Sequence, residues 1–366
     1  MSKLQKIRVN RIQALTADSC AIYFKVPMKD REWHFSSGQY ISLEIPLNGE
    51  KLRRSYSICT SPKLEKAGLL GRKKLVHLPG IAVKRVEGGK ISTYLNSDLK
   101  IGDEIDLLPP EGKFTIPQPK PEWIGMVAAG SGITPMMSHL YHLLEESNSK
   151  VVLCYGNQSW KSVMFKKELE KLEEKYPDRF FLYHFLSREA NQEKHPQVVY
   201  GRIKPSTAFK IIRKHSLEAK PHYFICGPAD LIQATKKHLK EVREVEARRI
   251  HIEWFEAPDS KKEAVEKEVE ESGSVHSKAR VILGGETHEV DIPEGSRILD
   301  AVLAAGLDAP FSCQSGVCCT CQAKGEPGDF ITDDCLSLSE DEIKEGHVLT
   351  CVGQVRRPEV TINYDV

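Results

Sequence analysis

Short stretches of alternating hydrophobic and polar residues dominate the first third of the chain, and Gly, Pro and Asp clusters separate them. A period of two residues is typical of β-strands that bury one face. Strands are predicted in the segments IRVNRI, CAIYFKV, QYISLEI, RSYSIC, GIAVKRV and DEIDLL. Short strands joined by turns in this way predict an antiparallel β-barrel over residues 1–117.

From Trp123 onward the pattern changes to apolar strands that alternate with amphipathic helices. The predicted strands are WIGMVAAG, VVLCYG, FFLYHFLS, HYFICG and RIHIEWF, and the predicted helices are PMMSHLYHLLEE, FKKELEKLEEKY, STAFKIIRKH and ADLIQATKKHLKE. Alternating strands and helices form a parallel sheet with helices on both faces. The pattern therefore predicts an α/β nucleotide-binding domain over residues 118–256.

Residues 257–277 are charged, contain few large apolar side chains and end in Gly and Ser, so they are predicted to link two domains. Val265 and Val269, four residues apart, allow one or two helical turns there. Beyond the linker, ARVILGGETHEVDIP predicts a β-hairpin that turns at Gly284-Gly285, and RILDAVLAAG predicts a short helix. Residues 278–366 are predicted to form a separate α+β domain.

The formal net charge of +1 conceals an uneven distribution of charge along the chain. Residues 278–366 hold 7 Lys and Arg against 16 Asp and Glu, whereas residues 1–256 hold 42 against 29. An acidic domain tethered to a basic one is attracted to it over about 8 Å at physiological salt. No Lys- or Arg-rich run concentrates the basic excess, which disfavours nucleic-acid binding, and no apolar run is long enough for membrane insertion.

Four cysteines near the C-terminus follow the spacing C-x4-C-x2-C, with the fourth after 29 further residues. This is the plant-type ligand spacing of a 2Fe-2S cluster, and it indicates an electron carrier. A zinc site is disfavoured because there is a single C-x2-C doublet. A disulfide framework is disfavoured because the chain is long and has no secretory signal, which also indicates the cytoplasm. The predicted ligands are Cys313, Cys318, Cys321 and Cys351.

The other cysteines do not belong to this pattern. Cys319 and Cys335 lie near it but outside the spacing. Cys20, Cys59 and Cys154 lie in apolar strands, where a thiol acts as a small hydrophobe.

The tetrapeptide Arg54-Ser55-Tyr56-Ser57 places Arg54 and Tyr56 on one face of a predicted strand and Ser55 on the other. A guanidinium beside a phenol suits a ligand that carries both a phosphate and a flat aromatic ring. A surface arginine and a half-buried tyrosine with no ligand would give the same tetrapeptide. Both interpretations stay open for these four residues alone.

A second segment connects a predicted strand to a predicted helix through Gly88-Gly89. Unpaired N–H groups from Gly89 to Ser92, together with the Ser92 hydroxyl, would form an anion site for a pyrophosphate. A helix with Ser92 as its N-cap accounts for the same residues, and both interpretations can hold at once.

In the second domain, residues 130–135 (GSGITP) follow an apolar strand and open a predicted helix. Glycines at a strand-to-helix turn allow a pyrophosphate to approach the backbone and the helix N-terminus. Residues 226–228 (CGP) end a later strand, at the carboxyl edge of the sheet where open α/β folds bind ligands. A buried core thiol is the alternative interpretation of Cys226.

The RSYS tetrapeptide, the VKR…GGKIS segment and the PEGKF segment together resemble the flavin-binding barrel of the ferredoxin-NADP reductase superfamily. The resemblance implies FAD, with Arg54 on the pyrophosphate, Tyr56 stacked on the isoalloxazine and Ser57 near flavin N5. The segment from Lys63 to Gly80 is longer than the usual connection in that superfamily, and its role is open. The residues implied to cradle the phosphates are Gly89, Lys90, Ile91 and Ser92. Lys84 is also predicted to bind the cofactor.

The same superfamily binds the nicotinamide nucleotide with its glycine and Cys-Gly-Pro motifs, and its thiol lies beside nicotinamide C4. Phe255 resembles the terminal aromatic that covers the flavin; Trp254 is the alternative occupant, and a core aromatic is a third interpretation. The implied nucleotide-binding residues are Gly130, Gly132, Thr134, Pro135, Cys226, Gly227 and Pro228, and the implied catalytic residues are Ser57 and Cys226.

Ser187 and Arg188 follow a predicted strand at the position where such folds discriminate between the two nicotinamide nucleotides. A hydroxyl with a cation suits the 2′-phosphate of NADPH, whereas a ribose diol is usually held by a carboxylate. The pair favours NADPH. Glu189 comes next and could accept from a ribose, so NADH is the alternative.

The order of FAD barrel, nucleotide domain, linker and C-terminal β-grasp ferredoxin domain resembles the reductase components of bacterial multicomponent oxygenases over essentially the whole chain. Reductases of phenylacetyl-CoA epoxidase, ketosteroid hydroxylases and hybrid-cluster proteins belong to this branch. The resemblance implies an NAD(P)H-dependent oxidoreductase that moves electrons through FAD to the cluster and on to a terminal oxygenase or another redox protein. A redox-sensing flavoprotein that binds the same cofactors without turnover is the alternative.

Overall fold

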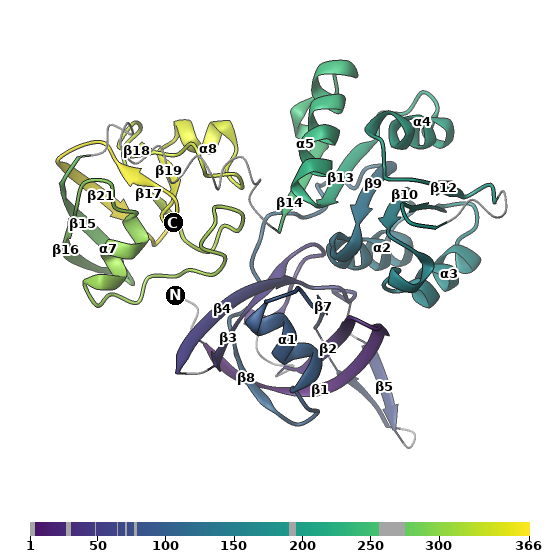
Figure 1. Cartoon of the computed structure of the whole chain (residues 1–366), viewed down its shortest axis with the longest axis horizontal. Coiled ribbons are helices and arrows are strands. Elements are labelled where there is room, and N and C mark those ends of the chain that lie inside the picture. The colour runs from purple at the N-terminus through teal and green to yellow at the C-terminus, as the bar shows by residue number, and fades with distance from the viewer. Residues whose placement is uncertain are drawn as a thin grey trace. The chain divides into compact units, whose positions relative to one another are not determined.

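The structure is a computed structural model that describes residues 4–26, 31–47, 49–63, 65–69, 72–76, 79–189, 195–255 and 275–366. The chain forms two compact units, one spanning Leu4–Glu253 and the other containing Trp254–Val366 (Figure 1). The predicted linker, including Val265 and Val269, lies almost wholly outside the described residues, and strand β15 begins at its last residue, Ser277. The domain boundaries proposed from the sequence remain predictions.

The N-terminal domain is a six-stranded sheet in the order β4-β3-β8-β1-β2-β7, and its strand pairs are antiparallel. A bridge between Ile58 and Ile81 brings the two outer strands together and closes the barrel. Alternate side chains such as Ile22 and Ile41 point inward and are fully buried. The predicted barrel is confirmed. Its strands are β1 (Gln5–Thr16), β2 (Ser19–Lys25), β3 (Tyr40–Leu47), β4 (Glu50–Ser57), β7 (Gly80–Lys84) and β8 (Glu104–Leu107), with a 3₁₀ turn η1 (Arg31–Trp33).

Two further elements interrupt the barrel. Strands β5 (Glu65–Leu69) and β6 (Arg72–Val76) form a separate antiparallel hairpin within the long segment from Lys63 to Gly80. Helix α1 (Lys90–Ser97) follows β7, and its buried Ile91 and Leu95 lie one turn apart, so they attach it to the barrel core.

The second domain is a sheet in the order β12-β11-β10-β9-β13-β14, with parallel pairing from β12 to β13. Figure 1 shows α2 and α3 on one face and α4 and α5 on the other. The central strand β10 is buried over nearly its whole length, as parallel strands covered on both faces are. The predicted α/β domain is confirmed.

The strands of this sheet are β9 (Trp123–Ala129), β10 (Lys150–Asn157), β11 (Phe180–Leu186), β12 (Val198–Tyr200), β13 (His222–Gly227) and β14 (Ile250–Trp254). The helices are α2 (Ile133–Glu146), α3 (Lys166–Lys175), α4 (Pro205–Ser216) and α5 (Ala229–Lys237), with short turns η2 (Gly130–Gly132), η3 (Trp160–Ser162), η4 (His238–Val242) and η5 (Ala247–Arg249).

Helix α2 joins the barrel to the nucleotide domain through two neighbouring polar residues. Ser138 Oγ donates a hydrogen bond to the Thr60 carbonyl at 2.7 Å, and His139 Nδ1 lies 3.0 Å from Ser37 Oγ. Burial, together with smaller effects of His142 and His251, lowers the pKa of His139 to about 3. His139 is therefore neutral at physiological pH, and the contact does not change its charge there.

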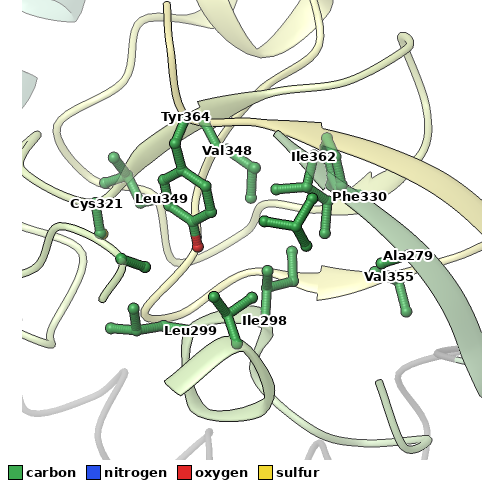
Figure 2. Packing of buried hydrophobic residues seen from close by; sticks show 14 of the residues in the cluster. Ala279, Ile298, Leu299, Cys321, Phe330, Val348, Leu349, Val355, Ile362 and Tyr364 are labelled. Atoms are coloured by element: carbon green, nitrogen blue, oxygen red, sulfur yellow. The ribbon is translucent and has the colours of Figure 1, made fainter. Parts of the chain in front are cut away.

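The C-terminal domain is a mixed sheet in the order β16-β15-β21-β17-β19, in which β15 pairs with β21 in parallel. Its buried apolar core lies between the sheet and helix α7, and Figure 2 shows part of it. The predicted hairpin turns at Gly284-Gly285, and both glycines have positive φ. The elements are β15 (Ser277–Leu283), β16 (Glu286–Ile292), β17 (Gln322–Lys324), β18 (Phe330–Ile331), β19 (His347–Leu349), β20 (Gln354–Val355), β21 (Glu359–Asn363), α7 (Ile298–Ala304) and α8 (Glu340–Lys344).

Among the described residues, no helix has the length and apolar character that crossing a membrane requires.

Candidate functional site

The RSYS segment lies at the end of β4 and includes a buried hydroxyl without a partner. Ser57 is 3% exposed, and its Oγ makes no hydrogen bond within the described part of the chain. Burial raises the pKa of Tyr56 to about 12, while the guanidinium of Arg54 opposes the rise. Ser55 Oγ instead bonds Ser42 Oγ of the neighbouring strand at 3.0 Å. A buried hydroxyl usually has a partner, so the unpaired Ser57 fits a bound group such as a flavin.

The first turn of α1 is open toward an anion. Its N-cap is Gly89, so the interpretation of Ser92 as the N-cap is wrong. The Ser92 hydroxyl instead accepts from the Val86 N–H at 3.1 Å and lies 3.3 Å from the Gly89 carbonyl, which fixes the turn. The first N–H groups of a helix lack intrahelical acceptors, so Lys90 and Ile91 present donors at this end.

The glycine motif and the Cys-Gly-Pro motif meet at the carboxyl edge of the parallel sheet. A Cβ on Gly132 would lie 2.2 Å from the Cys226 carbonyl oxygen and 2.8 Å from the Gly227 nitrogen. Only glycine allows these two loops to touch. Gly130 has φ 55°, a conformation that favours glycine, and Thr134 and Pro135 are buried in the first turn of α2. The structure therefore brings residues 130–135 and 226–228 together.

Glu253 lies near Cys226, and the sequence patterns did not indicate it as a site residue. Cys226 is fully buried; burial raises the pKa of its thiol well above the usual value, and Glu253 adds to the rise. The Glu253 residue keeps some exposed surface, but protein surrounds its carboxyl group closely enough that burial raises its pKa to about 8. A carboxyl group in the apolar strand IHIEWF was the available sequence signal.

Ser187 and Arg188 are exposed just beyond β11, as a role in nucleotide selection requires. Glu189 is engaged elsewhere: its Oε1 accepts a hydrogen bond from the Trp160 N–H at 3.0 Å. Phe255 is half-buried directly after β14 and Trp254 is buried. The assignment of either aromatic to the flavin stays a prediction.

The four predicted cluster ligands converge within the C-terminal domain. The Cys318 and Cys351 side chains hydrogen-bond the Cys313 thiol and hold its pKa far below its usual value, and Cys351 also hydrogen-bonds Cys321 and lowers its pKa. Four cysteine thiolates are the protein ligands that a 2Fe-2S cluster takes. The donor set thus fits a two-iron cluster.

Backbone contacts fix the conformation of the ligand loop. The Ser315 N–H donates to Cys313 Sγ at 3.4 Å. Gly316 has φ 72°, and a Cβ there would lie 2.2 Å from the Asp334 carbonyl oxygen. The loop therefore packs tightly around the thiols. None of the ten cysteines, all of which lie in described segments, forms a disulfide, and Cys20, Cys59 and Cys154 are buried as predicted.

A cavity of about 480 Å³ lies between the barrel and the helices α2 and α3. Its polar side chains are engaged with one another: Gln13 donates to Glu168 at 3.0 Å, and the Arg11 guanidinium lies 3.7 Å from the centre of the Tyr23 ring. None of the residues predicted to bind flavin or nucleotide lines it. The cavity is therefore separate from the predicted cofactor residues.

Three family descriptions match successive parts of the chain. Residues 6–116 match the oxidoreductase FAD-binding domain, residues 126–237 the oxidoreductase NAD-binding domain, and residues 281–356 the 2Fe-2S iron-sulfur cluster binding domain. These ranges cover most of the barrel, of the parallel sheet and of the C-terminal domain, and leave out the strands β14 and β21.

Two curated proteins are similar over almost their whole length. One component of the 1,2-phenylacetyl-CoA epoxidase of Escherichia coli is 32% identical, over 100% of this chain and 99% of that protein. The chain belongs to the FAD- and 2Fe-2S-containing oxygenase reductase family. The ferredoxin reductase component of 3-ketosteroid-9-alpha-monooxygenase from Mycobacterium tuberculosis is 30% identical, over 98% of the reductase described here and 96% of its own length.

Solved structures share the fold of the reductase. Phthalate dioxygenase reductase aligns with a TM-score of 0.59 at 21% identity and 98% coverage of both chains. An intact self-sufficient cytochrome P450 monooxygenase aligns with a TM-score of 0.70 at 18% identity, over 98% of this chain and 41% of that one. The reductase is an NAD(P)H oxidoreductase that uses FAD, a nicotinamide nucleotide and a 2Fe-2S cluster.

Proposed function

We propose that the reductase takes electrons from NADPH and delivers them, through FAD and its own 2Fe-2S cluster, to an oxygenase of the phenylacetyl-CoA epoxidase type. NADPH gives up two electrons as hydride, a 2Fe-2S cluster takes one at a time, and a flavin exchanges either. The observation that carries the proposal is the convergence of four cysteine thiols in a chain that also assembles a nucleotide site. Identity of 32% with an epoxidase component supports the partner.

Each flavin residue has a task that its position supports. Arg54 is exposed and would bind the pyrophosphate, Tyr56 would stack on the ring system, and the unpaired hydroxyl of Ser57 would bond a ring heteroatom. The open turn of α1 would hold the phosphates. The residues of this turn are Gly89, Lys90, Ile91 and Ser92, and Lys84 lies at the end of the preceding strand, β7.

For the nucleotide, the contact between Gly132 and the Cys226 backbone supports one shared site for both motifs. The N-terminus of α2 would bind the pyrophosphate. Cys226 stays protonated and would lie beside the nicotinamide, and Glu253 would hold a proton next to it near neutral pH. The supporting residues are Gly130, Thr134, Pro135, Gly227 and Pro228.

The preference for NADPH rests on a hydroxyl and a guanidinium at neighbouring positions, Ser187 and Arg188. The Oε1 atom of the next residue, Glu189, accepts from the Trp160 N–H at 3.0 Å. Ser187 and Arg188 are exposed next to it and would bind the 2′-phosphate. The proposed cluster ligands are Cys313, Cys318, Cys321 and Cys351, and ten cysteines without a disulfide between them support a reducing compartment such as the cytoplasm.

The proposal is tested with cofactor-loaded protein under anaerobic conditions. NADPH should bleach the flavin and then the cluster, and purified phenylacetyl-CoA epoxidase should reoxidise both and turn over its substrate. Reoxidation by a steroid hydroxylase or a hybrid-cluster protein instead would change the partner and keep the electron path. Bleaching without turnover by any acceptor would favour a redox-sensing flavoprotein.

A further inference from the structure

One polar atom lies unpaired in the apolar core of the C-terminal domain. Tyr364 is 7% exposed, and its hydroxyl oxygen is buried and makes no hydrogen bond that meets geometric limits within the described residues. Figure 2 shows its ring pointing into the core, with the oxygen at the inner end among apolar side chains. Leaving a buried hydroxyl unpaired costs about 1–3 kcal/mol. A phenylalanine would avoid that cost, so the oxygen calls for an explanation.

The backbone around Tyr364 holds the ring in this position. The Tyr364 N–H donates to the Ile282 carbonyl at 2.9 Å. The next residue, Asp365, accepts hydrogen bonds from the Gly284 and Gly285 N–H groups at 2.8 and 2.7 Å. The segment after β21 is thus fastened to the β15–β16 turn, and the ring is directed inward.

The hydroxyl that Tyr364 faces belongs to Thr350, the residue before the fourth predicted ligand. Burial raises the pKa of the Tyr364 phenol, and the Thr350 hydroxyl opposes that rise, so the two oxygens are neighbours. Thr350 is fully buried, and its Oγ1 donates to the Cys321 carbonyl at 3.0 Å. Because this bond uses its only hydroxyl proton, Thr350 Oγ1 can only accept from Tyr364.

Thr350 also connects this hydroxyl to the ligand thiols. Its N–H donates to the Cys321 carbonyl at 3.2 Å, and its carbonyl accepts from the Leu299 N–H at 2.9 Å. Thr350 directly precedes Cys351 in the chain, so it contacts both Cys321 and Cys351. Tyr364, Thr350 and the pair Cys321–Cys351 therefore form one contiguous group.

We propose that Tyr364 is a positioning residue that tunes the reduction potential of the 2Fe-2S cluster: its hydroxyl donates to Thr350 Oγ1 and orients that dipole toward the Cys321–Cys351 side. Hydrogen bonding and local polarity around ligand sulfurs set the potential of such clusters. A dipole that favours the added negative charge makes the cluster easier to reduce. The inference rests on the proposed cluster ligands.

The test is an EPR-monitored redox titration of the full chain loaded with cofactors. Tyr364→Phe should lower the equilibrium constant for cluster reduction about three- to tenfold, where tenfold corresponds to about 59 mV for one electron. Thr350→Val should give a similar loss, Thr350→Ser should keep the native value, and the double variant Tyr364→Phe/Thr350→Val should lose no more than Thr350→Val alone.

A purely structural role for Tyr364 predicts the opposite combination of results. In that case Tyr364→Phe would change thermal unfolding but leave the midpoint potential and the EPR line shape unchanged, which would overturn the inference. Failure of the ligand assignment is detected separately, because Cys318→Ser would then still assemble the cluster. If the potential is unchanged in Tyr364→Phe and the cluster is lost in Cys318→Ser, the tuning role is rejected and the ligand assignment is kept.

Discussion

Replacing Glu253 by Gln should make the stability of the reductase less dependent on pH. In the folded protein burial raises the pKa of this carboxyl from its ordinary value of 4.5 to about 8. Between these two values the folded chain keeps a proton that the unfolded chain has released. The free energy of unfolding therefore falls as the pH rises through this window, and no further loss occurs above the folded pKa.

The size of the effect follows from the shift. Each unit of pKa corresponds to about 1.36 kcal/mol, so a completely buried carboxylate would lower the free energy of unfolding by at most about 5 kcal/mol at a pH above the folded pKa. Glu253 keeps some exposed surface, which reduces the cost to roughly 2–4 kcal/mol. Gln has no charge to bury, so the variant should gain this amount relative to the native protein at pH 9 and almost none at pH 4.5.

The assay is thermal unfolding of the cofactor-free full chain at pH 4.5, 7 and 9 for the native protein and the variant. Glu218→Gln, at an exposed position after α4, is the matched control and should show no pH-dependent difference. A native-to-variant difference that stays constant from pH 4.5 to 9 would refute the reasoning. So would a variant that is less stable than the native protein at pH 9.

Three further experiments address the cofactors and the charge distribution. Cys318→Ser should abolish the 2Fe-2S visible and EPR signals while flavin reduction by NADPH persists, and Cys319→Ser should keep the cluster; the reverse result would mean that the ligand register is wrong. Arg188→Ala should lower kcat/KM about ten- to a hundredfold with NADPH and little with NADH, because a charge-assisted contact to phosphate contributes roughly 1.5–3 kcal/mol. The control variant Lys210→Ala, at an exposed position, should change kcat/KM with neither nucleotide. Equal losses with both nucleotides in Arg188→Ala would exclude Arg188 as the discriminator. The C-terminal 89 residues are acidic and the N-terminal part is basic, so added salt should slow the reduction of the cluster by the flavin and affect hydride transfer less. If the rate of cluster reduction, measured by stopped-flow absorbance, does not change with salt, the acidic surface serves an external partner instead.

Most of the architecture could be predicted because each domain has a regular hydrophobic period. Alternation identified the barrel strands, and the change to a helical period identified the parallel sheet. The β5–β6 hairpin was missed because its sequence, EKAGLLGRKKLV, does not alternate. Strand β12 was missed because it has three residues at the sheet edge.

Local spacing indicated which residues of the candidate site lie together: the structure brings the four cysteines into one domain and the glycine loop against the Cys-Gly-Pro loop. The site was not predictable where contacts between distant segments matter. Glu253 becomes notable through its proximity to Cys226, and Tyr364 through its proximity to Thr350. Ser92 was interpreted as an N-cap because its side chain suits that position, but the turn at Gly88-Gly89 begins the helix earlier.

The two ends of the nucleotide site differ in how freely they can vary during evolution. Gly132 and the Cys226 backbone are in such close contact that a side chain at position 132 would require the Cys226–Gly227 backbone to move. Ser187 and Arg188 are exposed and have no comparable steric restriction. With the proposed role of Ser187 and Arg188, a lineage of these reductases would exchange one nicotinamide nucleotide for the other by point mutation at the tip of β11, while the contact between the two loops is inherited unchanged.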